Sequence, residues 1–154
     1  LKRRDRKLIR KGHIFEYYED TLELPDGKEA LYDFINHKGA AAILPVDSNG
    51  KIIMVRQYRN AVNRFTLEIP AGGLNPGEDT KTAAARELEE ETGYRSEQIE
   101  HLLDLYTTVA YCNEKIGIYY TEELQPSKQH LDEDEYVEVT PKAMRMRKVI
   151  TRSD

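Results

Sequence analysis

The first half of the chain alternates between apolar and polar residues, which is the pattern of β-strands that bury one face. The segments with this pattern are 14–18, 21–24, 30–35, 40–46 and 52–58. Pro25, Asp26 and Gly27 precede the third segment, and these residue types favour a tight turn. Asn49 and Gly50 lie between the last two segments, and Asn-Gly is the strongest local signal for a hairpin turn. We therefore expect two hairpins in this half.

A helix is predicted between residues 80 and 93. Its alanines and leucine favour the helical conformation, and Asp79 or Thr80 can cap its start. Gly93 is a natural stop. After it we expect strands near 100–109, 116–121 and 136–139, a polar loop over 125–133, and a last helix that Pro141 opens. This mixture of strands and helices indicates one mixed α/β domain.

Size and composition narrow the classes of function. The 154 residues suffice for one domain with its own core, which we divide into an N-terminal strand and hairpin extension, 1–38, and the remainder, 39–154. The net charge of −5 argues against nonspecific nucleic-acid binding, and no apolar run is long enough to cross a membrane or resembles a signal peptide. The single cysteine, Cys112, excludes an internal disulfide and is typical of a cytoplasmic protein. The basic stretch 2–11 is interpreted as a solvated tail.

The predicted helix carries a cluster of carboxylates. With about 100° of rotation per residue, Glu87, Glu90 and Glu91 fall on one face, whereas Glu89 points away. Carboxylates gathered in this way repel one another and raise one another's pKa unless a cation lies among them, and such oxygen donors suit Mg²⁺ or Mn²⁺. A solvated acidic face is the usual meaning of such a run. The residues that surround it at fixed spacing favour a metal site instead: Gly72, Glu78, Arg86, Leu88, Gly93 and Tyr94.

Two neighbouring features support that interpretation. Arg86 lies one residue before Glu87 and four before Glu90, so its guanidinium can brace a carboxylate. An ordinary ion pair on the helix surface is the alternative. The stretch 67–73 alternates and then ends in two glycines, which indicates a short strand that enters a glycine-rich loop. Glycine there permits positive φ and a close approach of the backbone to a ligand.

Residues 72–94 read G-x5-E-x7-R-E-L-x-E-E-x-G-Y, and this segment resembles the signature of the Nudix hydrolases. Nearly the whole chain resembles the ADP-ribose pyrophosphatase branch of that family, through the N-terminal hairpin and the segments 55–59, 67–72 and 132–139. The resemblance implies the Nudix fold, an α/β fold in which a mixed β-sheet is sandwiched between helices (α/β/α), with an N-terminal antiparallel hairpin extension. It also implies metal-dependent hydrolysis of the pyrophosphate bond of a nucleoside diphosphate sugar, in which ADP-ribose would give AMP and ribose 5-phosphate.

The resemblance assigns roles to particular residues. The metal ligands would be Glu87, Glu90, Glu91 and the carbonyl of Ala71, holding roughly two or three Mg²⁺ or Mn²⁺ ions. The catalytic residues would be Arg86 and the base that accepts a proton from water, for which Glu133 and Glu135 remain alternatives. The substrate-binding candidates are Arg59, Glu68, Gly72 and Gly73. Arg59 suits a pyrophosphate because the forked donors of its guanidinium match phosphate oxygens. The alternative for Arg59 is an ordinary surface arginine. The alternative for Glu68 is a structural salt bridge.

The identity of the substrate stays undecided, because segment 107–114 contains no proline where that branch commonly carries one. Tyr111 and Asn113 would then face a different substrate surface. Another nucleoside diphosphate sugar, a dinucleotide or a damaged nucleoside triphosphate are alternative substrates, and a non-catalytic ADP-ribose sensor is an alternative function. The aromatic residues that could stack on adenine, or pack in the core or a dimer surface, are Phe15, Tyr17, Tyr18 and Tyr32. We expect a homodimer formed through the N-terminal hairpins, and neither a nucleic-acid nor a membrane partner.

Overall fold

The structure is a computed structural model that describes residues 1–129 and 138–139. Its strands are β1 (Lys2–Lys11), β2 (Phe15–Glu23), β3 (Glu29–His37), β4 (Ala40–Pro45), β5 (Val55–Arg59), β6 (Arg64–Glu68), β7 (Ala71–Gly73), β8 (Tyr94–Arg95), β9 (Glu100–Tyr106), β10 (Lys115–Thr121), β11 (Gln125–Pro126) and β12 (Glu138–Val139). Its helices are the 3-10 helix η1 (Asn60–Val62) and the α-helix α1 (Thr80–Thr92). Neither helix of this described part has the length and apolar character that a membrane crossing needs.

The N-terminal sheet contains β1, β2 and β3 in that order, with both neighbouring pairs antiparallel. The hairpin predicted at Pro25–Gly27 is confirmed and joins β2 to β3, although the two segments predicted before it form one strand, β2. The interpretation of the basic stretch 2–11 as a solvated tail is wrong, because it forms β1. The guanidinium of Arg6 donates two hydrogen bonds of 2.6 Å to the buried carboxylate of Asp20, which anchors β1 on β2.

The central sheet has the order β7-β4-β10-β9 and is mixed, because β10 runs parallel to β4 and antiparallel to β9. The helix α1 packs on one face of this sheet. Its residues Ala83, Ala84 and Leu88 join Ala41 and Ile43 of β4 in one fully buried cluster. The predicted α/β class is therefore confirmed, with α1 as the helical layer within the described residues.

The second predicted hairpin, between 40–46 and 52–58, is wrong in its pairing. The predicted turn forms, since Gly50 N donates to the carbonyl of Asp47 at 2.9 Å. Beyond it, Val46 and Ile52 make an isolated bridge and the chain then diverges. The reason is that β4 already has β7 on one edge and β10 on the other, which leaves no edge for β5. β5 instead pairs with β6 and β12 in a separate sheet.

The helix α1 begins and ends where the sequence predicted. The carboxylate of Asp79 accepts hydrogen bonds from the backbone of Lys81 and Thr82, both at 3.0 Å, and caps the start. Gly93 ends the helix with a φ of 72°, a conformation that glycine tolerates. The strands predicted near 100–109 and 116–121 are β9 and β10. β12 is the described part of the strand predicted at 136–139, and the helix predicted from Pro141 lies outside the described residues.

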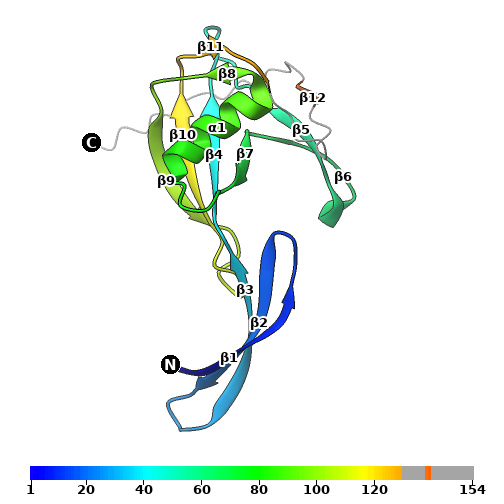
Figure 1. Cartoon of the computed structure of the whole chain (residues 1–154), viewed down its shortest axis with the longest axis vertical. Helices are drawn as coiled ribbons and strands as arrows, with labels where there is room; N and C mark the ends of the chain where they lie inside the picture. The colour runs from blue at the N-terminus through cyan, green and yellow to red at the C-terminus, as the bar shows by residue number, and fades with distance from the viewer. Residues whose placement is uncertain (130–137, 140–154) are drawn as a thin grey trace, which may run out of the picture.

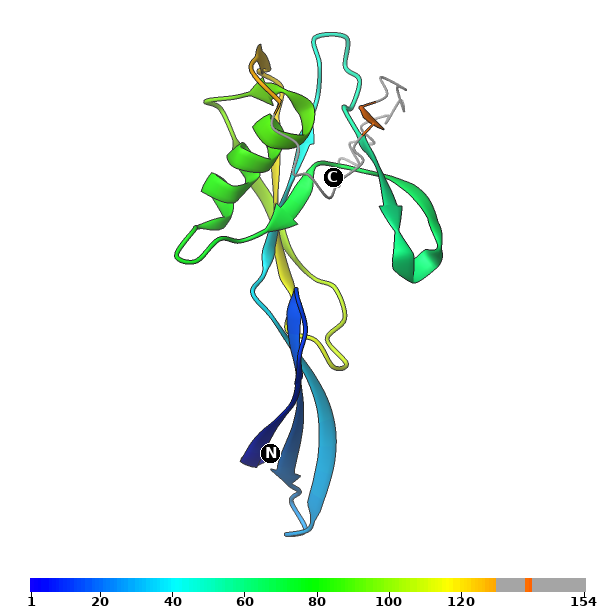
Figure 2. The ribbon, with the colours of Figure 1, turned by 45° about the vertical axis from the view of Figure 1, so that its right-hand side comes forward.

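Figure 1 shows the N-terminal sheet extending away from the part that contains α1 and β4. Segment 107–114 joins the two parts, because Ile35 N donates to the carbonyl of Tyr111 at 2.6 Å and Asn113 N donates to the carbonyl of Ile35 at 3.2 Å. The side-chain oxygen of Asn113 also accepts a bond of 2.8 Å from the backbone of His37. Figure 2 shows α1 on one side of the central sheet and the β5–β6 hairpin on the other.

Candidate active site

Strand β7 meets helix α1 at Gly72. An ideal Cβ at Gly72 would lie 2.0 Å from Oε1 and 2.6 Å from Oε2 of Glu87, so glycine alone leaves room for this carboxylate. The prediction of a glycine-rich loop is wrong, because Ala71–Gly73 pair with β4 as a strand. Neither glycine uses the positive φ that glycine permits. Glycine is required here by the close approach of Glu87.

Arg86 holds the carboxylates of this site together. Its Nε and Nη2 donate to the two oxygens of Glu78 at 2.9 and 3.0 Å, and its Nη1 donates to Glu87 at 2.6 Å and to Glu90 at 2.8 Å. Nη2 also donates to the carbonyl of Gly73 at 3.1 Å. The hydrogen bonds from Arg86 hold the pKa of Glu78 below its ordinary value, and the bonds to Glu78 raise the pKa of Arg86. Arg86 was predicted to bind one carboxylate, and in the structure it binds three.

The other glutamates of α1 differ in burial and in direction. Glu87 and Glu91 are buried, at 7% and 4% exposed, whereas Glu90 is more open. Oε2 of Glu91 accepts a hydrogen bond of 3.0 Å from Ala71 N, so the end of α1 is bonded to the start of β7. Glu89 points away from this group, as predicted, and accepts a hydrogen bond from the hydroxyl of Ser127.

The donor set suits a hard divalent cation. Glu87, Glu90 and Glu91 offer carboxylate oxygens, and the carbonyl of Ala71 belongs to the strand that Glu91 binds. Across residues 1–129 and 138–139, no three acidic, histidine or cysteine side chains already have the arrangement of a metal-binding group. Arg86 binds one oxygen of Glu87 and one of Glu90. Because a carboxylate has two oxygens, each of these groups can bind Arg86 and a cation together.

Arg59 and Glu68, both predicted to bind substrate, lie on the two paired strands of the β5–β6 hairpin and bind each other diagonally through their side chains. Nε and Nη2 of Arg59 donate to the two carboxylate oxygens of Glu68 at 2.8 and 2.5 Å. These hydrogen bonds from Arg59 lower the pKa of Glu68, and the hydroxyl of Thr66 donates to the same carboxylate at 2.6 Å. This geometry matches the alternative of a structural salt bridge for Glu68, and a contact of either residue with substrate stays a prediction.

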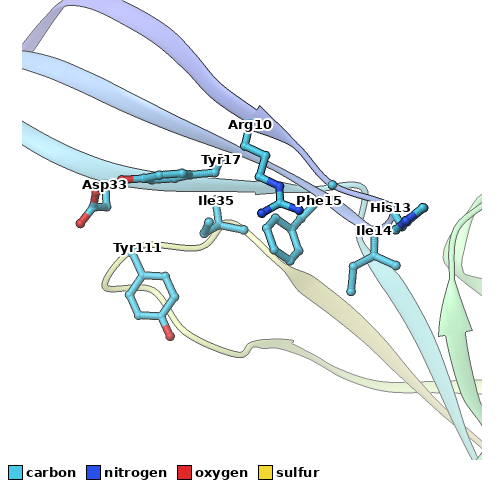
Figure 3. A pocket seen from close by; sticks show the side chains of 9 residues that line it. Arg10, His13, Ile14, Phe15, Tyr17, Asp33, Ile35 and Tyr111 are labelled. Carbon is cyan, nitrogen blue, oxygen red and sulfur yellow. Dashed lines mark hydrogen bonds between the residues drawn. The ribbon is translucent and has the colours of Figure 1, made fainter. Parts of the chain in front are cut away.

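An open pocket of about 830 Å³ lies where the N-terminal sheet meets segment 107–114 (Figure 3). Phe15 and Ile35 line it from the sheet, and Tyr111 lies across from them on the segment without proline. At its edge the hydroxyl of Tyr17 donates to Asp33 at 2.6 Å. Two of the four aromatic residues considered for adenine stacking, Phe15 and Tyr17, therefore line this pocket together with Tyr111.

Some parts of the site were missed from the sequence, and others lie outside the described residues. Glu78 was recognised in the motif but was given no role, although its fixed spacing before Arg86 was a signal for a contact between them. Lys38, which lies against Gly73, had no signal in the sequence, because the fold alone brings the two together. Both candidates for the base, Glu133 and Glu135, lie outside the described residues.

Comparisons with known proteins agree with this geometry. The family model described as NUDIX domain matches residues 36–152. An ADP-ribose pyrophosphatase of Bacillus subtilis (strain 168) is 42% identical over 130 residues, which are 83% of this chain and 70% of that protein. A methanol dehydrogenase activator of Bacillus methanolicus is 39% identical over 130 residues, which are again 83% of this chain and 70% of that protein. A crystal structure of ADP compounds hydrolase has a TM-score of 0.79 at 24% identity, covering 90% of this chain and 76% of that chain, which shows the fold. The chain belongs to the NUDIX domain family.

Proposed function

We propose that this protein hydrolyses the pyrophosphate bond of a nucleoside diphosphate sugar, with ADP-ribose as the first expected substrate. Water would cleave ADP-ribose into AMP and ribose 5-phosphate. The observation that carries the proposal is the fit of Glu87 beneath Gly72, where the absence of a Cβ lets a buried carboxylate reach β7 beside Arg86. The 42% identity to an ADP-ribose pyrophosphatase supports the choice of substrate.

Nudix hydrolases generally need a divalent metal such as Mg²⁺, and the residues present fit one. Glu87, Glu90, Glu91 and the carbonyl of Ala71 would hold roughly two or three ions, Mg²⁺ or Mn²⁺. Such ions neutralise the diphosphate and lower the pKa of the attacking water. Arg86 keeps Glu87 and Glu90 oriented through the bonds of 2.6 and 2.8 Å, so the carboxylates are placed before substrate arrives.

The remaining steps belong to residues whose roles are proposals. Glu133 or Glu135 would accept the proton from the attacking water, as a general base must. Arg59 would bind the pyrophosphate while Glu68 orients its guanidinium through the two bonds between them. Gly72 and Gly73 would contact the substrate through the backbone groups of β7, since Glu87 and Lys38 occupy the space that their missing Cβ atoms leave.

A homodimer through the N-terminal sheet is part of the proposal. Several large apolar side chains of this sheet and of its β1–β2 turn are exposed, among them Leu8, Ile14 and Leu31 at 49%, 66% and 65%. Apolar area that is removed from water contributes about 25 cal/mol per Å², which favours covering it with a second copy. Residues 1–38 would then serve as the dimer-forming extension and 39–154 as the hydrolase unit. Light scattering at micromolar concentration that finds a fully active monomer would contradict this.

The experiment that tests the function is a substrate panel with purified protein. ADP-ribose, other nucleoside diphosphate sugars and dinucleotides are each incubated with Mg²⁺ or Mn²⁺, and the nucleotide products are identified by chromatography. We expect AMP and ribose 5-phosphate from ADP-ribose, and loss of turnover in excess chelator. Absence of pyrophosphate cleavage with every substrate would overturn the proposal. Tight binding of ADP-ribose without cleavage would instead support the sensor alternative.

A further inference from the structure

Gly73 lies directly against the side chain of Lys38. An ideal Cβ at Gly73 would lie 2.5 Å from Cε and 3.1 Å from Nζ of Lys38. The backbone of Gly73 does not have positive φ, so its conformation does not require glycine. The missing Cβ therefore has one evident consequence, which is to let the lysine side chain cross β7 at this residue.

This contact places a cation beside the candidate metal site. Gly73 is also the residue whose carbonyl accepts the bond of 3.1 Å from Arg86. Strand residues rise by about 3.3 Å each, so Gly73 lies about 7 Å along β7 from the proposed metal ligand Ala71. Lys38 and Arg86 thus contact the same glycine: Lys38 lies beside its Cα, and Arg86 binds its carbonyl oxygen.

The two cations approach β7 from different directions. Successive residues of a strand point to opposite faces, and the missing Cβ of Gly72 points toward Glu87 of α1. The missing Cβ of Gly73 therefore points to the opposite face, where Lys38 lies. That face is turned toward the β5–β6 hairpin, which carries Arg59 (Figure 2).

The ammonium of Lys38 has room for a ligand. Lys38 is exposed, and no hydrogen bond or ion pair joins it to another of the described residues. Its side chain borders two open pockets. One, of about 280 Å³, it shares with Lys11, His13 and Glu16, and the other, of about 460 Å³, it shares with His37, Asp104 and Lys115. A cation in this position attracts anions, because the carboxylate of Asp104 is already paired with Lys115 at 2.7 Å and that of Glu16 accepts hydrogen bonds from Tyr18 and Asn36.

We propose that Lys38 binds a non-bridging oxygen of the substrate's diphosphate from the face of β7 opposite Glu87. Gly73 is the positioning residue, because a side chain there would push the ammonium away from the strand. The inference rests on the proposed function, and it adds to that function a residue that determines the affinity for the diphosphate.

The alternative to binding the diphosphate is that Lys38 only covers β7 at Gly73 with the aliphatic part of its side chain. Long lysine side chains do cover apolar surface while the charge stays in water. Lys38→Met keeps that cover and removes the charge, so it separates the two roles. Gly73→Ala does the reverse, since it keeps the charge and displaces a flexible side chain at little cost to the fold.

The test uses steady-state kinetics with ADP-ribose and Mg²⁺, and calorimetric binding of its non-hydrolysable α,β-methylene analogue. Lys38→Met should raise KM and the dissociation constant about tenfold, as for the loss of one charge-assisted hydrogen bond, with kcat within about twofold. Gly73→Ala should raise both about threefold or more, and the double variant should be no worse than Lys38→Met, because the two changes remove one interaction. Lys51→Met, at an exposed residue beyond the turn that follows β4, is the matched control and should change neither.

Melting temperatures confirm that each variant is folded. A dissociation constant of Lys38→Met within about twofold of the wild type, with wild-type hydrolysis intact, overturns the inference and leaves the proposed function standing. Additive effects of the two substitutions overturn the positioning role of Gly73. A wild type that neither cleaves ADP-ribose nor binds its analogue overturns both the function and the inference.

Discussion

Replacing Gly72 with alanine places a methyl group where the Glu87 carboxylate lies. The new Cβ would sit 2.0 Å from Oε1, 2.3 Å from Cδ and 2.6 Å from Oε2 of Glu87, all far inside van der Waals contact. The overlap is relieved only if Glu87 turns away or if α1 and β7 separate. Overpacking of this kind costs about 1–3 kcal/mol of stability. For a chain of this length, each kcal/mol corresponds to about 2–4 °C in Tm.

The effect on activity should exceed the effect on stability. A displacement of about 1 Å at a catalytic group can lower the rate about a hundredfold, and Glu87 has to move by more than that. We therefore expect Gly72→Ala to fold, to melt several degrees lower, to need more Mg²⁺, and to lose about a hundredfold or more in kcat. Tm is measured by scanning calorimetry, and kcat by Mg²⁺ titration with ADP-ribose.

Two controls sharpen this test. Gly73→Ala adds the same methyl group to the next residue, where it meets the flexible end of Lys38, so its kcat should stay near that of the wild type. Gly72→Ala combined with Glu87→Asp shortens the carboxylate and should recover part of the lost Tm without recovering activity. Wild-type kcat and Tm in Gly72→Ala would refute the packing of Glu87 beneath Gly72 and its place in the site.

Other expectations concern the ligands, the base and the N-terminal sheet. Glu90→Gln or Glu91→Gln should lower kcat by orders of magnitude and weaken Mg²⁺ binding in calorimetry, because each removes a carboxylate from the metal ligands. Glu133→Gln or Glu135→Gln should lower kcat by about 10²- to 10⁴-fold with Mg²⁺ binding unchanged; changes below about threefold in both would exclude this acidic stretch as the source of the base. Hydrogen bonds from Arg6 hold the pKa of Asp20 below its ordinary value of 3.8. The ionised carboxylate therefore stabilises the fold above that pH, and the stabilisation is lost as the pH falls below it. Asp20→Asn should lower Tm more near about pH 7 than at a pH below the lowered pKa of Asp20, and an equal loss at both would contradict the ionic account.

Local features of the chain were predictable from residue order alone. The cap at Asp79, the stop at Gly93 and the shared face of Glu87, Glu90 and Glu91 depend on neighbours within one or two helical turns, and the structure places the helix as predicted. The turn at Gly50 formed for the same reason, since its hydrogen bond joins residues three apart. In each case the physical cause, a helical period or a backbone conformation, acts over a few residues.

Contacts between distant residues were decided by the tertiary structure. The alternation in 40–46 is compatible with any neighbour, and the pairing of β4 with β7 and β10 depends on which edges the complete sheet leaves open. Two adjacent glycines look alike in the sequence. Yet Gly72 makes room for Glu87 and Gly73 makes room for Lys38, because successive strand residues face opposite sides and the fold brings a different partner to each.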